Sequence, residues 1–219
     1  MNHYKTLMLV MFFLSIFAFS KVHAIIKDYS LLGKVIYLDA GHGGRDAGAI
    51  SNTFMEKEMN LLLAKKLEKE LTSKGALVYQ TREGDYDLSQ STINKKRDDL
   101  YRRVKLINNS KADLYISIHL NSSPSNRWNG IQVFYSDILK ENKKVAQIIT
   151  DTMKQNMNNV REYKKENNYY MYSKLKIPGV LIETGFISNK NDNYKIRQKE
   201  YQDILIRNIS KGIDYYFNK

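Results

Sequence analysis

A short buried strand followed by a glycine-rich turn constrains this chain more than any other part of its sequence. Residues 34–48 read KVIYLDAGHGGRDAG. The apolar run from Val35 to Leu38 is typical of a buried strand, and three glycines then flank His42. Glycine tolerates positive φ and allows other groups to come close, so the chain can turn sharply there. Because α/β proteins bind ligands in such turns at strand ends, His42 is a candidate site residue.

Apolar runs and amphipathic segments alternate along the rest of the chain. Residues 56–74 predict a helix that starts with acidic residues, carries leucines at every fourth position and stops before Gly75. By the same criteria we predict strands over 35–38, 76–81, 113–120, 130–135 and 180–183, a short strand over 169–172, a turn over 188–193, and helices over 98–110, 138–158 and 196–216. Because strands and helices alternate, we expect an α/β fold: a single domain whose mostly parallel, twisted sheet of about six strands has helices on both faces.

The N-terminal segment has the pattern of a secretory signal. Lys5 gives a positive start, residues 7–19 are almost wholly apolar, and residues 22–24 place small side chains at the positions that a signal peptidase reads. The apolar run is shorter than the roughly 20 residues of a spanning helix, so we favour an export signal over a retained membrane anchor. We therefore expect a leader over 1–24 and one exported domain over 25–219, with membrane contact only through the N-terminal segment.

Charge and cysteine content narrow the chemistry. The net charge is +12, which suggests a polyanionic neighbour such as nucleic acid, a membrane or an anionic cell wall. The chain has no cysteine, which excludes thiol nucleophiles, cysteine zinc sites and a lipid anchor on cysteine. A metal site would therefore have to use histidine and carboxylate ligands.

Two histidines and two acids fall where such a site would form. Of the four histidines, only His42 and His119 lie beyond the expected leader. His119 and Glu183, like His42, each end an apolar strand, and Glu56 begins a helix. Since parallel strands end at one edge of a sheet, we expect these side chains to meet. Catalytic zinc sites use three protein ligands, so two histidines and a carboxylate are the usual set available, with a further carboxylate as the base.

Other carboxylates and other roles remain open on the residues alone. Glu58 and Asp46 are alternative third ligands, although Glu58 should point away from Glu56 on the helix. Asp46 could instead accept a hydrogen bond from a histidine N–H. His119 could be a core histidine, and Glu56 a plain helix-start acid. Glu183 follows an apolar run, and a purely structural role there would need a cationic partner, because an unpaired buried carboxylate is costly.

Five segments together resemble the zinc-dependent N-acetylmuramoyl-L-alanine amidases, a family of cell-wall hydrolases. They are LDAGHGGRDAGA at 38–49, EKEMNL at 56–61, TREGD at 81–85, ADLYISIHLNS at 112–122 and VLIETGFISN at 180–189. Within the family, residues 99–135 look like the germination-specific, or spore-cortex, amidases of endospore-forming bacteria.

The resemblance implies a reaction and a set of site residues. His42, Glu56 and His119 would bind one Zn²⁺ ion, Glu183 matches the family's catalytic glutamate, and residues 25–219 would be the catalytic domain. The reaction would be hydrolysis of the amide that joins N-acetylmuramic acid to L-alanine in peptidoglycan. In the spore branch this is the first step toward the muramic-δ-lactam needed for germination. A peptidoglycan deacetylase would act next, an accessory lipoprotein would be a partner, and the location would be the forespore intermembrane space and the cortex.

Alternative functions are a general vegetative cell-wall amidase and a non-catalytic wall-binding or activator protein on the same fold. The latter would be expected to lack a ligand or the base, and none is missing. Only the charge suggests a nucleic-acid binder, and the leader argues against nucleic acid as a partner. Ala40 replaces a proline that the family usually has, which leaves the ligands unaffected. Arg82, Arg103 and Asn121 fit family positions, and Trp128 could stack on sugar, although ion pairs and packing are the more usual roles of such residues.

Overall fold

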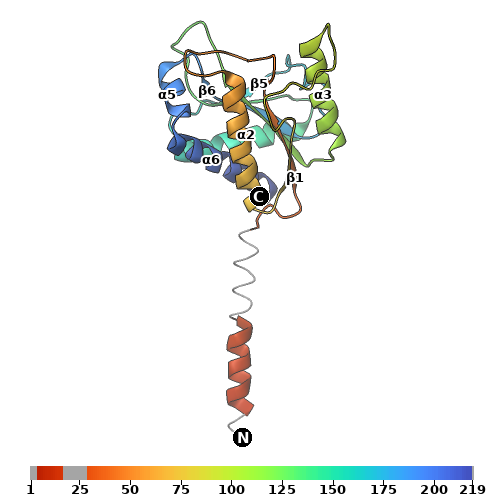
Figure 1. Cartoon of the computed structure of the whole chain (residues 1–219). Helices are drawn as coiled ribbons and strands as arrows, with labels where there is room; N and C mark the ends of the chain where they lie inside the picture. Colours follow the sequence, from red (N-terminus) through yellow and green to blue (C-terminus); the bar gives the residue numbers. More distant parts are fainter. Residues whose placement is uncertain (1–3, 17–28, 219) are drawn as a thin grey trace.

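The computed structural model describes residues 4–16 and 29–218, and a mixed six-stranded sheet forms the centre of its folded domain (Figure 1). The order of the strands across the sheet is β2-β1-β3-β6-β4-β5. The strands are β1 (Val35–Ala40), β2 (Leu77–Gln80), β3 (Leu114–Asn121), β4 (Gln132–Tyr135), β5 (Lys164–Lys165) and β6 (Gly179–Phe186). The helices of the domain are α2 (Glu56–Ser73), α3 (Lys95–Asn109), α4 (Lys140–Asn156), α5 (Lys190–Ile196) and α6 (Lys199–Asn218).

Strand direction decides where a site can form. β1 pairs in parallel with β2 and β3, and β3 pairs in parallel with β6. β4 runs antiparallel to β6 and carries the short β5 on its outer side. The carboxyl ends of β1, β3 and β6 therefore lie side by side at one edge of the sheet. The predicted mostly parallel sheet of about six strands is confirmed.

Helices cover both faces of the sheet, as predicted. α2 contacts β1 and β3, and α4 contacts β4 and β6, while α6 packs on α2 and α4 (Figure 1). The leucine stripe of α2, Leu63, Leu67 and Leu71, is fully buried in this core. On the opposite face, Val104 and Ile107 of α3 form a smaller apolar cluster with side chains of β1 and β3. Burial of these stripes is the main force that holds the layers together.

The prediction of a strand over 169–172 is wrong. These residues form a turn. The edge strand of the sheet is instead β5, which consists of two exposed lysines. Tyr172 is buried against Phe134 and Leu181, and its ring contacts that of Tyr169 edge-on. Tyr172 is therefore buried on the face of the sheet, whereas Tyr169 stays 44% exposed and charged residues protect the edge.

The predicted turn over 188–193 is only partly right, because residues 187 and 188 form a turn but α5 begins at Lys190. The side chain of Asn189 accepts hydrogen bonds from the backbone N–H groups of Asn191 and Asp192, which is how a helix N-cap acts. The final helix, predicted from 196, begins at Lys199 because α5 occupies the preceding residues.

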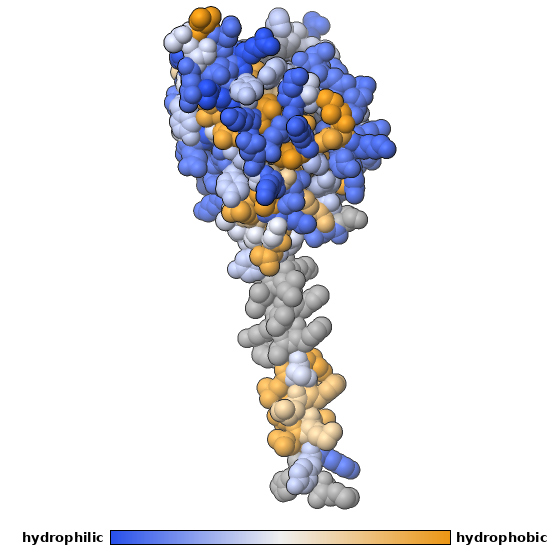
Figure 2. Space-filling model, turned by 90° about the vertical axis from the view of Figure 1, so that its right-hand side faces the viewer, coloured by the Kyte–Doolittle hydropathy of each residue, from blue (hydrophilic) through white to orange (hydrophobic). Residues whose placement is uncertain are grey.

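Residues 4–16 form a helix whose side chains are mostly apolar and exposed (Figure 2). No helix within the described parts of the chain has both the length and the apolar character needed to cross a membrane. Residues 1–3 and 17–24 of the expected leader lie outside the described residues, so the leader stays a prediction. The face of the domain in Figure 2 is mostly hydrophilic, in keeping with the high content of lysine and arginine.

Candidate metal centre and active site

The first candidate ligand, His42, stands on a strained turn after β1. Its own backbone has a φ of 62°, in the left-handed region that side chains other than glycine rarely adopt, and Gly43 and Gly44 follow with positive φ as well. Two arginines donate hydrogen bonds to the backbone of this turn. Arg103 donates to the backbone oxygen of His42 at 2.5 Å, and Arg82 donates to that of Gly41 at 3.0 Å. These bonds fix the direction in which the imidazole points.

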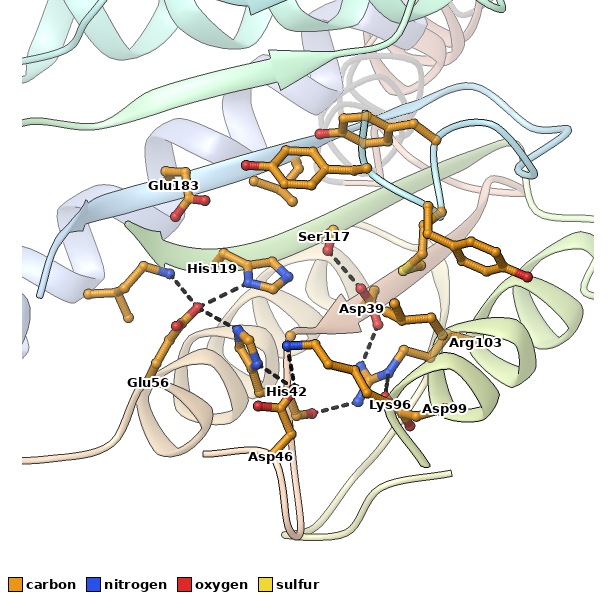
Figure 3. Close-up of a pocket in the computed structure, with 18 of the residues that line it drawn as sticks. Asp39, His42, Asp46, Glu56, Lys96, Asp99, Arg103, Ser117, His119 and Glu183 are labelled. Atoms are coloured by element: carbon orange, nitrogen blue, oxygen red, sulfur yellow. Dashed lines mark hydrogen bonds and ion pairs between the residues drawn. The ribbon is translucent and has the colours of Figure 1, made fainter. Parts of the chain in front are cut away.

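The second candidate ligand, Glu56, brings the two histidines together. It is the first residue of α2 and is 3% exposed. Its Oε1 lies 3.1 Å from His42 Nε2 and 3.0 Å from His119 Nδ1 (Figure 3). Backbone N–H groups of Ala49 and Leu120 also donate to this carboxylate, at 2.9 and 3.1 Å. The start of one helix thus meets the ends of two strands.

The pKa shifts of Glu56 and His42 agree with this arrangement. Burial alone would raise the pKa of Glu56, but hydrogen bonds and charge interactions with His119 and His42 outweigh it and lower that pKa far below its usual value. Burial alone would lower the pKa of His42, but Glu56 and Asp46 raise it. The site therefore favours an ionised carboxylate between two imidazoles.

Two glycines leave the room that the ligands occupy. A Cβ on Gly41 would lie 2.1 Å from a ring carbon of His119, and a Cβ on Gly48 would lie 2.6 Å from Glu56 Oε2. Any other residue at these positions would push a ligand away. Glycine is thus required at these positions because the side chains of His119 and Glu56 pack directly against the backbone there.

The donor set fits one divalent metal ion. One ligand atom from each of His42, Glu56 and His119 lies within 4.8 Å of the others. Two imidazole nitrogens and one carboxylate oxygen form a common ligand set of catalytic zinc sites, which keep a further position open. All three side chains also line a cavity of about 330 Å³, so an ion bound there would be accessible to a substrate.

Glu183 lies on the neighbouring strand, beside His119. The two residues are register partners in β3 and β6 (Figure 3). Glu183 is 7% exposed, and its Oε2 accepts no hydrogen bond from the described residues. Burial, and then the negative charge of Glu56, raise the pKa of Glu183 well above its ordinary value. Within the described part of the chain no lysine or arginine pairs with it, so the structural role considered from the sequence lacks its cation.

The alternative ligands considered from the sequence lie elsewhere. Glu58 accepts a hydrogen bond from the backbone N–H of Met55 at the start of α2 and does not join the histidines. Asp46 lies on the far side of His42, with its Oδ2 3.0 Å from Nδ1 of the imidazole and 3.5 Å from Lys96 Nζ. A carboxylate behind a ligating histidine orients the ring and makes it more basic.

Sequence reasoning missed a buried polar network beneath the site. Its centre is Asp39, which is 1% exposed and accepts hydrogen bonds from Thr81, Arg103 and Ser117 at 2.7–2.8 Å (Figure 3). Arg103 also donates to Asp99 at 2.8 Å and to the carbonyl oxygens of the turn. The signals in the sequence were a polar residue at the end of an apolar strand and the match of Arg103 to a family position. Its partners come from distant segments that only the fold brings together.

The cavity extends from the metal centre to the tyrosines of the 169–172 turn. Its walls come from β3, β6, α3 and this turn (Figure 3). Beyond the charged groups it is lined largely by apolar and aromatic side chains, among them Leu100, Tyr115, Tyr169, Met171, Leu175 and Leu181. The arrangement combines a polar reaction centre with an apolar wall, as substrate sites commonly do.

Comparison with known proteins agrees with this geometry. The family model described as N-acetylmuramoyl-L-alanine amidase (Amidase_3) matches residues 36–215. A germination-specific N-acetylmuramoyl-L-alanine amidase of Bacillus subtilis is 44% identical over 194 residues, which cover 86% of this chain and 82% of that protein. The amidase LytC of Bacillus subtilis is 33% identical over 189 residues, covering 85% of this chain and 36% of that protein.

A solved structure has the same architecture. It is that of the CwlD amidase from Clostridioides difficile in complex with the GerS lipoprotein. It superposes with a TM-score of 0.81 at 35% identity and covers 85% of this chain and 99% of that one.

Proposed function

We propose that this chain, which belongs to the N-acetylmuramoyl-L-alanine amidase family and acts on peptidoglycan, has the peptidoglycan of the spore cortex as its substrate. It would cleave this substrate with one zinc ion and Glu183. The observation that carries the mechanism is the meeting of His42, Glu56 and His119 beside a buried carboxyl that has no cationic partner. The observation that supports the cortex is the 44% identity to a relative that is named germination-specific.

His42, Glu56 and His119 would hold the zinc ion through the atoms that already face one another. When bound, zinc supplies Lewis acidity, which polarises the substrate carbonyl and makes water more acidic. Asp46, behind His42, orients that imidazole. Arg82 and Arg103 hold the backbone from which the imidazole projects.

Glu183 would move the protons of the reaction. Its carboxylate accepts a proton from the water that attacks the carbonyl carbon of the lactyl group. As the C–N bond breaks, it donates that proton to the nitrogen of the leaving L-alanine. A carboxyl whose pKa is raised by burial can perform both steps near neutral pH, which a normal glutamate does poorly.

The spore assignment places the protein in a sequence of reactions. Cleavage leaves muramic acid without a stem peptide, and a deacetylase would then allow the muramic-δ-lactam to form. The leader expected over 1–24 would deliver the domain to the space between the forespore membranes, where cortex is assembled. An accessory lipoprotein is a further proposed partner, because the similar CwlD amidase was solved in complex with one.

The test is a digest analysed by mass spectrometry. The purified zinc-loaded protein should release stem peptides with a free L-alanine amino terminus from isolated cortex peptidoglycan. Spores that lack the protein should contain no muramic-δ-lactam. Cleavage of vegetative wall with no change in spore muropeptides would favour a vegetative amidase. No cleavage by the zinc-loaded protein would favour a non-catalytic wall-binding protein.

A further inference from the structure

A half-exposed tryptophan lies against an arginine outside the site already described. Trp128 is 52% exposed, in the loop between β3 and β4. The guanidinium carbon of Arg161 is 4.7 Å from the centre of its ring and 5.7 Å from that of Phe186. Phe186 is buried. The arginine therefore contacts both rings through cation–π interactions, and part of the tryptophan stays open to solvent.

This cluster is joined to the catalytic cavity through the pairing of Phe186 with a residue that lines it. Phe186 ends β6, three residues after Glu183, which corresponds to about 10 Å at the usual rise of a strand. A register shift between β3 and β6 makes Phe186 the partner of Asn121, and Asn121 lines the cavity. A polymer that reaches Glu183 could therefore extend onto the tryptophan.

The loop that carries Trp128 is fixed at several points. Asn189 donates to the backbone oxygen of Asn126 at 2.7 Å, and the N–H of Gly130 donates to Asp192 at 2.7 Å. The backbone N–H of Arg161 is bonded to the carbonyl of the residue after Gly130 at 2.8 Å. The ring is thus held in place before any ligand binds, which lowers the entropy cost of binding.

The surroundings favour a sugar as the occupant. A pyranose ring presents a face of C–H groups that packs on an aromatic ring, while its hydroxyl groups need polar partners. The loop supplies such partners, since residues 121–127 read NSSPSNR. No carboxylate of the described residues pairs with Arg161, so its N–H groups can donate to a ligand. A protein partner would instead need a larger apolar surface around the ring.

We propose that Trp128, held by Arg161 and Phe186, is a subsite that stacks on a sugar of the glycan strand next to the muramic acid whose amide is cleaved. The proposal rests on the proposed function, because the family's substrate supplies the glycan. It adds a recognition element for the polymer that the metal centre and Glu183 do not provide.

Fluorescence tests the subsite without any need for hydrolysis. Trp128 is the only tryptophan of the chain, so the intrinsic emission of the full protein reports on this position. Titration with peptide-free glycan strands of alternating N-acetylglucosamine and N-acetylmuramic acid should change the emission saturably. Arg161→Ala should weaken that response. An emission that stays constant while the same protein cleaves peptidoglycan would overturn the subsite and leave the amidase function intact. A response to glycan without cleavage would overturn the proposed function only.

Kinetics provide the second readout. Trp128→Ala should raise KM on long peptidoglycan strands about tenfold, the size expected for loss of one stacking contact, and much less on a muropeptide with a single disaccharide. Trp128→Tyr should restore most of the affinity. Tyr29→Ala is the matched control, because Tyr29 is also about half exposed but lies near Gly75, away from the catalytic edge. An equal effect of Trp128→Ala on both substrates would contradict stacking on the polymer.

Discussion

Two buried acids near the candidate metal centre have opposite surroundings. Asp39, at the end of β1, receives hydrogen bonds from an arginine and two hydroxyl groups. Burial alone would raise its pKa, but the charge of Arg103 and the Ser117 hydroxyl lower it to about 2. Glu183, on β6, has an Oε2 without a hydrogen-bond partner among the described residues, and burial raises its pKa well above the ordinary value. Both are labelled in Figure 3.

The difference separates a carboxylate that builds the site from one that is available for chemistry. Asp39 is fixed in its charged form, and through Arg103 it supports the turn that carries His42. Glu183 forms no ion pair within the described residues, so its carboxyl group can gain and lose a proton during a reaction. A buried, poorly paired acid is costly to keep, and such acids cluster at functional sites.

Removal of Arg103, the cation that pairs with Asp39, should have the largest effect on stability. Arg103→Met leaves Asp39 and Asp99 buried without their partner, and we expect the free energy of unfolding to fall by about 3–5 kcal/mol. Urea unfolding measures this change. Arg102→Met on the same helix is the control, because Arg102 pairs with Asp98 near the surface, and its loss should cost under about 1 kcal/mol. Similar losses for the two variants would remove the distinction between the buried network and an ordinary surface pair.

Lowering the pH should reveal the contribution of Asp39 to the stability of the fold. Its pKa is lower in the folded state than in the unfolded chain, so it stabilises the fold above pH 4 and loses that effect as the pH falls toward 2. A shift of this size corresponds to about 2 kcal/mol. Unfolding experiments from pH 5 to pH 2 should show a loss about 2 kcal/mol larger in the wild type than in Asp39→Asn, because Glu56 and other carboxylates with lowered pKa values destabilise both proteins in acid. Parallel acid limbs in the two proteins would contradict the assignment.

The stability effect at Glu183 should be smaller and opposite in sign. Because its pKa is raised in the folded state, the metal-free fold loses stability as the pH rises above the ordinary value of glutamate. Glu183→Gln removes that cost, so the metal-free variant should be about 1 kcal/mol more stable than the wild type at pH 7 and equal to it near pH 4. Thermal unfolding after chelation measures the difference. A clear loss of stability at pH 7 would mean that Glu183 has a structural partner.

Local patterns in the sequence were sufficient for much of the fold. The leucine stripe of α2 and the apolar runs of β1, β3 and β6 each carry their own periodicity, so their positions and the type of sheet could be predicted. The turn over 169–172 could not be predicted, because its tyrosines are as common in strands as in a segment that packs on the face of a sheet. Tertiary packing decided between the two. The start of α5 depends on a side-chain cap at Asn189, which the prediction overlooked.

The site was predictable only where a residue's position in an element indicated its role. His42 follows β1, and His119 and Glu183 lie near the carboxyl ends of β3 and β6, so parallel pairing alone placed them near one edge. The partners of Asp39 lie 42, 64 and 78 positions away along the chain, and no local pattern joins them. The cation–π contacts of Trp128 likewise depend on loops that meet only in the folded protein.

The most direct test of the whole account measures metal content and turnover on one variant. Glu183→Gln should bind about one zinc per chain, as the wild type does, and should cleave peptidoglycan about 10²–10⁴-fold more slowly, the usual size of the contribution from a general base. Glu58→Gln should keep both properties, because Glu58 lies two positions from the candidate ligand on α2 and, among the described residues, bonds only to its own helix start. A Glu183→Gln protein with full metal and near wild-type turnover would contradict the central claim that this buried acid carries the protons of the reaction.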